Sequence, residues 1–167
     1  MSAQSKPPFA LRPYLPADAP VLAEIFRLSI EELTGEDYNE DQQRAWAEAA
    51  DDEQAFAQKL GQQLVLIATL GGEPVGFASL ENNNHIDLVY VHPSVARQGV
   101  GNMLVDALEK LAGARGTQKL TVEASDNAQD FFRQRGYEAQ SRNTIEMSGE
   151  WLANTTMDKK LPGKEKS

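Results

Sequence analysis

The sequence contains no cysteine, which excludes disulfide bonds, thiolate zinc sites and a cysteine nucleophile. Its two histidines, His85 and His92, are too few for a histidine-rich metal site, so we expect no bound metal. Basic residues are outnumbered as well: 16 Lys and Arg stand against 25 Asp and Glu, for a formal net charge of -9. A protein that binds the phosphate backbone needs a clustered basic face to displace counterions, so we do not expect a nucleic-acid partner.

Long apolar segments are also missing. The longest apolar run, Leu64–Leu70, is far shorter than the roughly 20 residues of a membrane-spanning helix. Residues 1–8 have no apolar core of the kind found in signal peptides. We therefore expect a cytoplasmic protein with no membrane partner.

The remaining composition is that of an ordinary globular protein. Of its 167 residues, 41% are hydrophobic and 25% are charged. This length fits one domain over residues 1–167, without internal repeats. The polar, proline-bearing or lysine-rich ends, residues 1–8 and 162–167, are expected to fray, which leaves a core of residues 9–161.

Hydrophobic periodicity predicts helices first and then strands that alternate with helices. Turn residues 71–74 join two of the strands into a β-hairpin. The order implies an α/β (α+β) fold with a mixed sheet and helices on both faces. Helices are predicted from Asp18 to Gly35, at the capping boxes Asn39/Gln42 and Asp51/Gln54, from Val100 to Gly113 and from Asn127 to Arg135. Strands are predicted at 64–68, 75–80, 85–91 and 119–124 and around 137–147 and 151–159.

The most informative stretch is residues 88–104, where a strand, a loop that begins at a proline and a glycine turn lead into a helix. The first N–H groups of a helix lack intrahelical partners and lie at the positive end of its dipole, so they can hold an anion. Gly99 and Gly101 would allow a phosphate close to the backbone, and Arg97 adds a positive charge. For an isolated glycine pair of this kind, an ordinary loop is the commoner explanation.

Two common phosphate loops do not fit this stretch. A Walker loop ends in Gly-Lys-Ser/Thr, whereas Gly101 is followed by Asn102 and Met103. A dinucleotide-binding fingerprint has a third small residue where this chain has Leu104. ATP and NAD are therefore not the expected ligands.

Two motifs in the order and spacing of one family are present instead. Residues 90–101 correspond to the first motif, a strand that ends in hydrophobic-x-Pro followed by the loop pattern Arg/Gln-x-x-Gly-x-Gly/Ala. Residues 128–137 correspond to the second motif, Ala-x-x-Phe-Tyr/Phe-x-x-x-Gly-Phe/Tyr. With these motifs, residues 9–161 resemble the GCN5-related N-acetyltransferase (GNAT) superfamily, and residues 38–46 are similar to a branch with a tyrosine and a tryptophan there. The resemblance implies the GNAT fold: a mixed, mostly antiparallel sheet of about seven strands, flanked by four or more helices.

The resemblance also implies acetyl-CoA as co-substrate. Its pantetheine arm would lie along the strand 85–91, and its acetyl oxygen would meet backbone N–H groups near Val89 and Tyr90, where negative charge develops in the transition state. The positions that the resemblance places at acetyl-CoA are Val89, Tyr90, Val91, Arg97, Gln98, Gly99, Val100, Gly101, Asn102, Ser125, Asn127 and Phe131.

Three positions depart from the family pattern. Ala96 stands in the Arg/Gln position of the loop, so Arg97 or Gln98 would have to lie beside the phosphates. Ser125 replaces an asparagine but can still form a hydrogen bond. Phe132 stands where relatives often carry the tyrosine that protonates the departing thiolate. Tyr38 or Tyr137 could protonate the thiolate instead, although Tyr137 has the sequence position of a core residue.

Candidate catalytic residues lie on the strand 85–91. Strict alternation would place His85, Asp87, Val89 and Val91 on one face. His85 falls where some relatives carry a glutamate base and Asp87 is one pleat nearer the thioester, so either could accept the proton of the amine, with Glu123 as a third candidate. A salt bridge of Asp87, a solvated His85 and a strand-edge hydrogen bond of Glu123 are the alternatives.

Tyr38 and Trp46 could form a wall of the acceptor site, although core packing is the commoner explanation for a tryptophan at helical spacing. The sequence thus predicts an N-acetyltransferase that transfers the acetyl group of acetyl-CoA to a primary amine of a small molecule or peptide. The alternative is a non-catalytic acyl-CoA-binding module. We expect a monomer or a homodimer.

Overall fold

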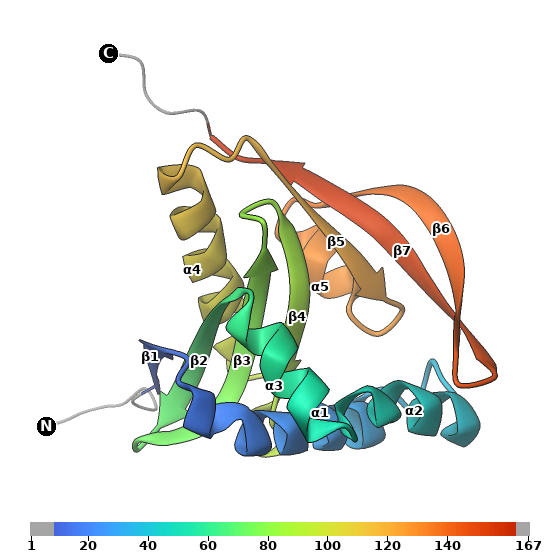
Figure 1. The fold of residues 1–167 in the computed structure, drawn as a ribbon. Coiled ribbons are helices and arrows are strands. Elements are labelled where there is room, and N and C mark those ends of the chain that lie inside the picture. Colours follow the sequence, from blue (N-terminus) through green and yellow to red (C-terminus); the bar gives the residue numbers. More distant parts are fainter. Residues whose placement is uncertain (1–8, 163–167) are drawn as a thin grey trace, which may run out of the picture.

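The computed structural model describes residues 9–162, and all of its strands belong to one seven-stranded sheet (Figure 1). The strands are β1 (Phe9–Pro13), β2 (Leu64–Leu70), β3 (Glu73–Glu81), β4 (His85–Val91), β5 (Lys119–Ser125), β6 (Glu138–Met147) and β7 (Glu150–Lys160). Their order in the sheet is β1-β2-β3-β4-β5-β7-β6. Neighbouring strands are antiparallel except for β4 and β5, which are parallel. The predicted fold class is confirmed.

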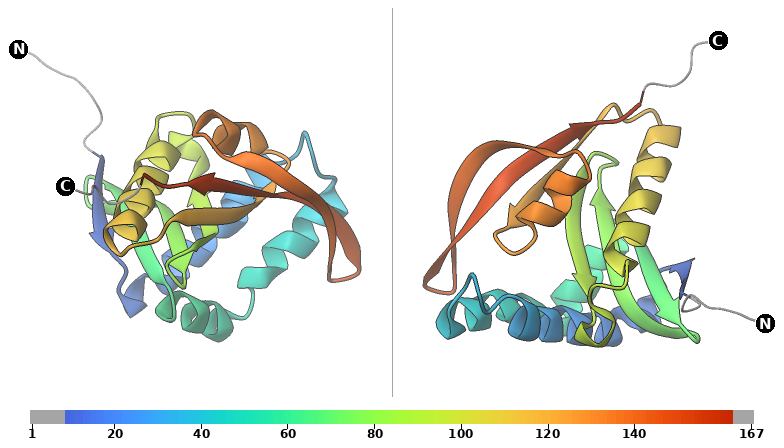
Figure 2. Two further views of the ribbon diagram at one scale, coloured as in Figure 1. Left: turned by 90° about the horizontal axis from the view of Figure 1, so that it is seen from above. Right: turned by 180° about the vertical axis from the view of Figure 1, so that it is seen from behind.

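Five α-helices cover the two faces of the sheet (Figures 1 and 2). They are α1 (Ala19–Leu33), α2 (Glu40–Ala47), α3 (Glu53–Gly61), α4 (Val100–Ala114) and α5 (Gln129–Gln134), with short 3-10 turns at Pro16–Asp18, Glu48–Ala50 and Pro93–Val95. One hydrophobic cluster joins α1, α2 and α3 to the sheet, and a second cluster joins α4 and α5 to the other face. The prediction of helices on both faces is therefore confirmed.

Local signals explain where most helices begin. The apolar stripe of α1 is buried, with Leu22, Ile25 and Phe26 no more than 3% exposed. The capping box before α2 is confirmed by reciprocal hydrogen bonds of 2.8 and 2.9 Å between Asn39 and Gln42. The box predicted at Asp51 and Gln54 is wrong by one residue. The side chain of Asp52 caps α3 instead, accepting from the Ala55 N–H at 3.1 Å.

The hairpin predicted at residues 71–74 joins β2 and β3, and both Gly71 and Gly72 have the positive φ that such a tight turn requires. The two predicted C-terminal strands are β6 and β7. Strand β1 was not predicted, because its five residues form a strand only through pairing with distant Leu66–Leu70. The ends expected to fray lie outside the described residues, apart from Pro162, and a single domain for the whole chain stays a prediction.

The two parallel strands separate along their length. β4 and β5 pair only at His85 with Thr121 and at Ile86 with Val122. Beyond these pairs, β4 continues beside β3 and β5 continues beside β7, so the sheet divides between them (Figure 1). Backbone groups on the β5 side of β4 are therefore free of a strand partner after Ile86. This divided part of the sheet is where the candidate site lies.

Candidate active site

Two connected cavities occupy the divided part of the sheet. The first, which we call the aromatic cavity, has a volume of about 200 Å³ and lies among α1, α2, β4 and the β6–β7 hairpin. The second, which we call the strand opening, has a volume of about 100 Å³ and passes between β4 and β5. The lining of both includes Trp46, Asp87, Tyr90, Glu123 and Ser125. We call the place where these five shared residues lie the junction of the two cavities.

A β-bulge at Asp87 determines which side chains of β4 face the junction. Ser79 of β3 pairs with Leu88, whereas the next residue, Leu80, pairs with Ile86, so Asp87 is an extra residue in β4. The bulge breaks the alternation of faces. The prediction that Asp87 shares a face with Val89 and Val91 is therefore wrong: Asp87 lines the aromatic cavity together with Leu88 and Tyr90.

Two side chains, one in α3 and one just after it, bind the carboxylate of Asp87. Lys59 Nζ lies 3.1 Å from Asp87 Oδ2, and Gln63 Nε2 donates to the same oxygen at 3.0 Å. Within residues 9–162, both contacts fall on Oδ2, which leaves Oδ1 for a ligand in the cavity. The alternative of a salt bridge for Asp87 is thus also realised. The pair is partly solvated, since 20% of the Asp87 side chain and 48% of the Lys59 side chain are exposed.

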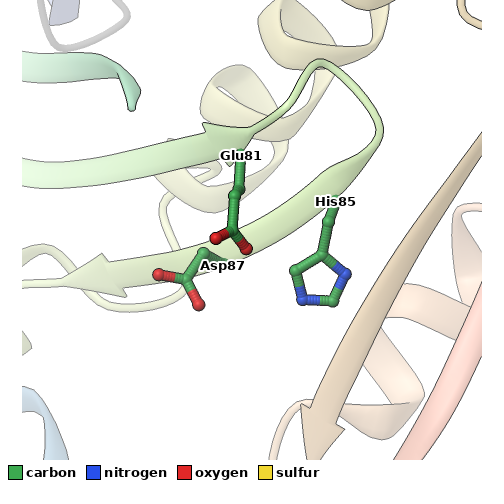
Figure 3. A group of neighbouring side chains, drawn as sticks. All are labelled: Glu81, His85 and Asp87. Carbon is green, nitrogen blue, oxygen red and sulfur yellow. The ribbon is translucent and has the colours of Figure 1, made fainter. Parts of the chain in front are cut away.

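His85 lies beside Asp87 but is not among the residues that line the two cavities. Its Nδ1 is 2.7 Å from Thr121 Oγ1, and its Nε2 is 3.9 Å from Glu123 Oε1. Figure 3 shows His85 and Asp87 on β4 with Glu81, which lies at the end of β3. Of the three predicted base candidates, Asp87 and Glu123 thus reach the junction, and His85 lies behind them.

The cluster of Glu81, His85 and Asp87 also has the chemistry of a metal site, because one ligand atom from each lies within 4.8 Å of the others. The ammonium of Lys59 already places a positive charge at Asp87. A divalent cation would therefore have to displace Lys59 or bind against its repulsion. The expectation of no bound metal stays a prediction.

Four aromatic side chains form one side of the aromatic cavity: Phe26, Tyr38, Trp46 and Tyr90. Trp46 Nε1 donates to the Tyr90 hydroxyl at 3.2 Å, and the Tyr38 hydroxyl donates to the Ala153 carbonyl at 2.6 Å while accepting from the Asp126 N–H at 2.9 Å. Burial raises the pKa of both tyrosines above the ordinary value, so both are neutral at physiological pH. Both residues predicted for the acceptor site, Tyr38 and Trp46, thus line the cavity and also pack in the core.

The loop before α4, which the sequence predicts to hold an anion, has a backbone conformation that suits this role. Arg97 and Gly99 both have positive φ, of 65° and 89°, and Gly99 is the N-cap of α4. The N–H groups of the first turn therefore point out of the helix beside the exposed Arg97 and Gln98. A Cβ added at Gly99 would meet nothing within 4 Å, so the backbone there is open to a ligand. The loop is thus well suited to hold a pyrophosphate.

Not all predicted contacts at this cradle can involve side chains. Val100 is buried with 1% exposure, so only its backbone is available. Asn102 Oδ1 accepts from Arg135 Nη1 at 3.0 Å. Phe131 packs over Gly101, whose added Cβ would lie 3.4 Å from the ring, which places Phe131 against the helix N-terminus.

Four of the five remaining positions predicted to contact acetyl-CoA lie along the strand opening. Val89 and Tyr90 line it from β4, and Ser125 and Asn127 line it from the end of β5 and the loop that follows. Ser125 Oγ donates to Asn127 Oδ1 at 2.7 Å, so the two act together. Val91 pairs with Gly76 in β3 and is not among the lining residues.

The two tyrosines considered as replacements for the missing proton donor differ in position. Phe132 is among the residues that line the strand opening, although its side chain is buried with 3% exposure. Tyr137 is 1% exposed, donates to Glu109 at 2.8 Å and lies outside both cavities. Tyr38 lies in the aromatic cavity, but its proton is bonded to a backbone carbonyl. The structure thus confirms that Tyr137 is a core residue.

A sheet that divides between two parallel strands, with a glycine turn and a helix N-terminus beside the division, is the arrangement expected from the resemblance to the acetyltransferases. The family model described as an acetyltransferase (GNAT) domain matches residues 34–161. The chain therefore belongs to the GNAT family, and it is an acetyl-CoA-dependent N-acetyltransferase. Acetyl-CoA and an amine acceptor are its substrates.

Individual relatives agree with this assignment. A crystal structure of a GCN5-related N-acetyltransferase from Rhodopseudomonas palustris is 63% identical, covers 95% of this chain and 98% of its own, and superposes with a TM-score of 0.91. YafP of Escherichia coli K12, described as an uncharacterized N-acetyltransferase, is 32% identical over 88% of this chain and 93% of its own. The PaiA N-acetyltransferase of Thermoplasma acidophilum in complex with coenzyme A shares the fold, with a TM-score of 0.77 at 17% identity over 92% of this chain and 99% of its own.

Several residues of the site were not predicted from the sequence. Lys59 and Gln63, which hold Asp87, come from a helix and turn more than 20 residues earlier in the chain. Three more, Ile145, Met147 and Leu152, line the cavity from the β6–β7 hairpin. The alternation of Ile145 and Met147 marks one strand face, but no local signal shows that this face covers α2. Among residues 9–162, no helix is long and apolar enough to cross a membrane.

Proposed function

We propose that this enzyme transfers the acetyl group of acetyl-CoA directly to a primary amine of a small molecule or peptide, and that Asp87 accepts the proton of the amine. The observation that carries the proposal is the junction at Asp87, where the aromatic cavity meets the strand opening. An amine in the aromatic cavity and a thioester in the strand opening would approach each other there. The matches described above are N-acetyltransferases, which gives the non-catalytic alternative no support.

The main-chain groups of β4 would hold the acyl end of acetyl-CoA. After Ile86 the strand has no partner on its β5 side. N–H groups alternate in direction along a strand, and the His92 N–H donates to Val75 of β3, so the N–H of Val89, rather than that of Tyr90, would be free to donate to the thioester oxygen. Donors fixed in this way stabilise the negative charge that develops on that oxygen during attack. Ser125 and Asn127, across the strand opening, would position the pantetheine arm.

Removal of a proton from the amine is the main energetic demand on the protein. An alkylammonium with a pKa of about 10.4 is neutral in roughly one molecule in 10³ to 10⁴ at pH 7, which corresponds to about 4.6 kcal/mol. Asp87 faces the cavity with Oδ1 available, and it can receive the proton directly or through water. Glu123 lines the same junction with 54% of its side chain exposed, so it could pass the proton to solvent.

Acetyl-CoA is expected to raise the melting temperature of the protein, whereas NAD and ATP are not. The open backbone at Gly99 suits a pyrophosphate, but the chain lacks the motifs that fit the other two ligands. Binding to the folded state alone contributes about 2.7 kcal/mol at a ligand concentration one hundred times Kd. Thermal unfolding with each ligand checks this, and equal shifts with all three would show that the loop is a general anion site.

Phe132→Tyr is expected to raise kcat by up to about tenfold at neutral pH, because it adds a proton donor beside the departing thiolate. The gain is modest because a thiol pKa of about 8.5 already makes the thiolate a fair leaving group. Steady-state kinetics with thermal unfolding as the folding control measures the effect. A large fall in kcat in a stably folded variant would show that the Phe132 position does not face the thiolate.

A further inference from the structure

Resting on the proposed function, we propose that the amine acceptor is a small molecule with one ammonium group and one uncharged aromatic or bulky apolar group, of the size of an arylalkylamine. The proposal narrows the acceptor from amines in general to those whose body is apolar. Three properties of the aromatic cavity carry it: its walls, its volume and the position of its charges.

The walls of the cavity are apolar on two opposing sides. Phe26, Trp46 and Tyr90 form one side, and their rings pack at centroid distances of 4.6 Å for Phe26 and Tyr90 and 6.4 Å for Trp46 and Tyr90. The β6–β7 hairpin forms the facing side. Its contributing side chains are Ile145, Met147 and Leu152. A group in contact with these side chains would lose part of its hydration, so a charged or strongly polar group there would lack partners.

The volume of the cavity is comparable with that of a single ring. A cavity of about 150 Å³ with apolar walls accommodates benzene, and the aromatic cavity has about 200 Å³. It therefore admits a single ring with a short aminoalkyl arm. A peptide would have to place its backbone N–H and C=O groups against side chains that offer few partners.

The charges of the cavity are gathered at the junction with the strand opening. The charged residues in its lining are Asp87, Glu123 and Lys59, for a net charge of -1. Lys59 is paired with Asp87, so its positive charge is largely balanced and the net negative charge of the lining disfavours a carboxylate on the acceptor. One ammonium would complement the two carboxylates, which places the amine nitrogen at the end of the cavity that faces the thioester and the apolar group at the other end.

The proposal predicts a marked preference within a panel of primary amines. We expect kcat/KM for 2-phenylethylamine to exceed that for ethylamine, which lacks the ring, and that for phenylalanine, which adds a carboxylate, by about a hundredfold each. Spermidine and a peptide with one lysine and an acetylated N-terminus complete the panel. Release of CoA thiol with saturating acetyl-CoA is the measurement.

A pair of variants on β6 tests whether the cavity wall makes this selection. Ile145 lines the cavity, whereas its neighbour Thr144 is exposed on the other side of the strand. Ile145→Ser is expected to lower kcat/KM for 2-phenylethylamine about tenfold and to leave that for ethylamine nearly unchanged. Thr144→Ser is expected to change neither.

Three results would count against the proposal, and they are distinguishable. Faster turnover of spermidine, phenylalanine or the lysine peptide than of 2-phenylethylamine would exclude the apolar acceptor and leave amine acetylation in place. Binding of acetyl-CoA with no CoA release for any amine would overturn the proposed function as well. Equal loss for 2-phenylethylamine and ethylamine in Ile145→Ser would show that this side chain does not contact the ring.

Discussion

Asp87→Asn is expected to lower kcat for amine acetylation by about 10² or more near neutral pH while leaving the KM for acetyl-CoA nearly unchanged. Asparagine keeps the size of the side chain and its place in the β4 bulge, but it cannot accept the proton of the amine. The ion pair that the substitution removes is partly solvated, so the variant should remain folded. Acetyl-CoA would still be held by the loop before α4 and by main-chain groups.

The pH dependence of this variant separates a base from a residue that only positions the amine. Activity of Asp87→Asn should rise about tenfold per pH unit toward the pKa of the amine, about 10.4, because the neutral amine then arrives already deprotonated. If Asp87 only positioned the amine, the substitution would lower kcat by the same factor at every pH. Steady-state rates with one amine from pH 6 to about 10 measure this difference.

Three further variants complete the comparison. Glu81→Gln is the matched control, because Glu81 lies in the same cluster but does not line either cavity, and we expect little change. His85→Ala should lower kcat less than Asp87→Asn, since His85 lies behind the junction. If Asp87→Asn and His85→Ala both keep nearly full activity at all pH values, the assignment of the base to β4 is wrong and Glu123→Gln should show the loss instead.

Gly99→Val is expected to raise the KM for acetyl-CoA by about 10- to 100-fold, because the new side chain would stand where the pyrophosphate approaches the helix N-terminus. The loss of one charge-assisted hydrogen bond, worth about 1.5–3 kcal/mol, accounts for an effect of this size. The change also strains the backbone, since Gly99 has φ of 89°. A loss of stability of about 1–3 kcal/mol therefore accompanies the change in KM.

Gly72→Val supplies a control with the same strain. Gly72 has φ of 87°, an added Cβ there would meet nothing within 4 Å, and it lies in the β2–β3 turn. The two variants should lose similar stability in chemical denaturation, but only Gly99→Val should bind acetyl-CoA more weakly in calorimetry. Similar affinity for acetyl-CoA in both variants would contradict the role of the loop. Gly101 is less suitable, because an added Cβ would press on Phe131.

The parts of the fold that could be predicted from the sequence depend on signals within a few residues. Asn39 and Gln42 form the predicted capping box because both partners lie in one helical turn. Asp51 and Asp52 are adjacent and chemically identical, so the pattern alone does not show which caps α3. Strand β1 has no such signal, because it depends on hydrogen bonds to β2 more than 50 residues later.

The sequence predicted many of the residues of the candidate site, but less of how their side chains are arranged. The glycine turn before α4 and the residues of β4 were identified from motifs, because their spacing follows from local backbone conformation. The bulge at Asp87 depends on how β4 pairs with β3, which alternation along one strand does not reveal. The contribution of the β6–β7 hairpin to the cavity was also not predicted, because it depends on contacts between residues far apart in the sequence. One example is the hydrogen bond from the Tyr38 hydroxyl to the carbonyl of Ala153, 115 positions later.

The central claim is direct transfer of the acetyl group from acetyl-CoA to an amine at the junction beside Asp87. The most direct test follows free CoA and intact-protein mass in a single turnover, first with acetyl-CoA alone and then after addition of 2-phenylethylamine. Direct transfer predicts no CoA release and no change in protein mass before the amine is added, followed by equal amounts of CoA and N-acetyl amine. Release of CoA before the amine, with an acetyl group gained by the protein, would contradict the account.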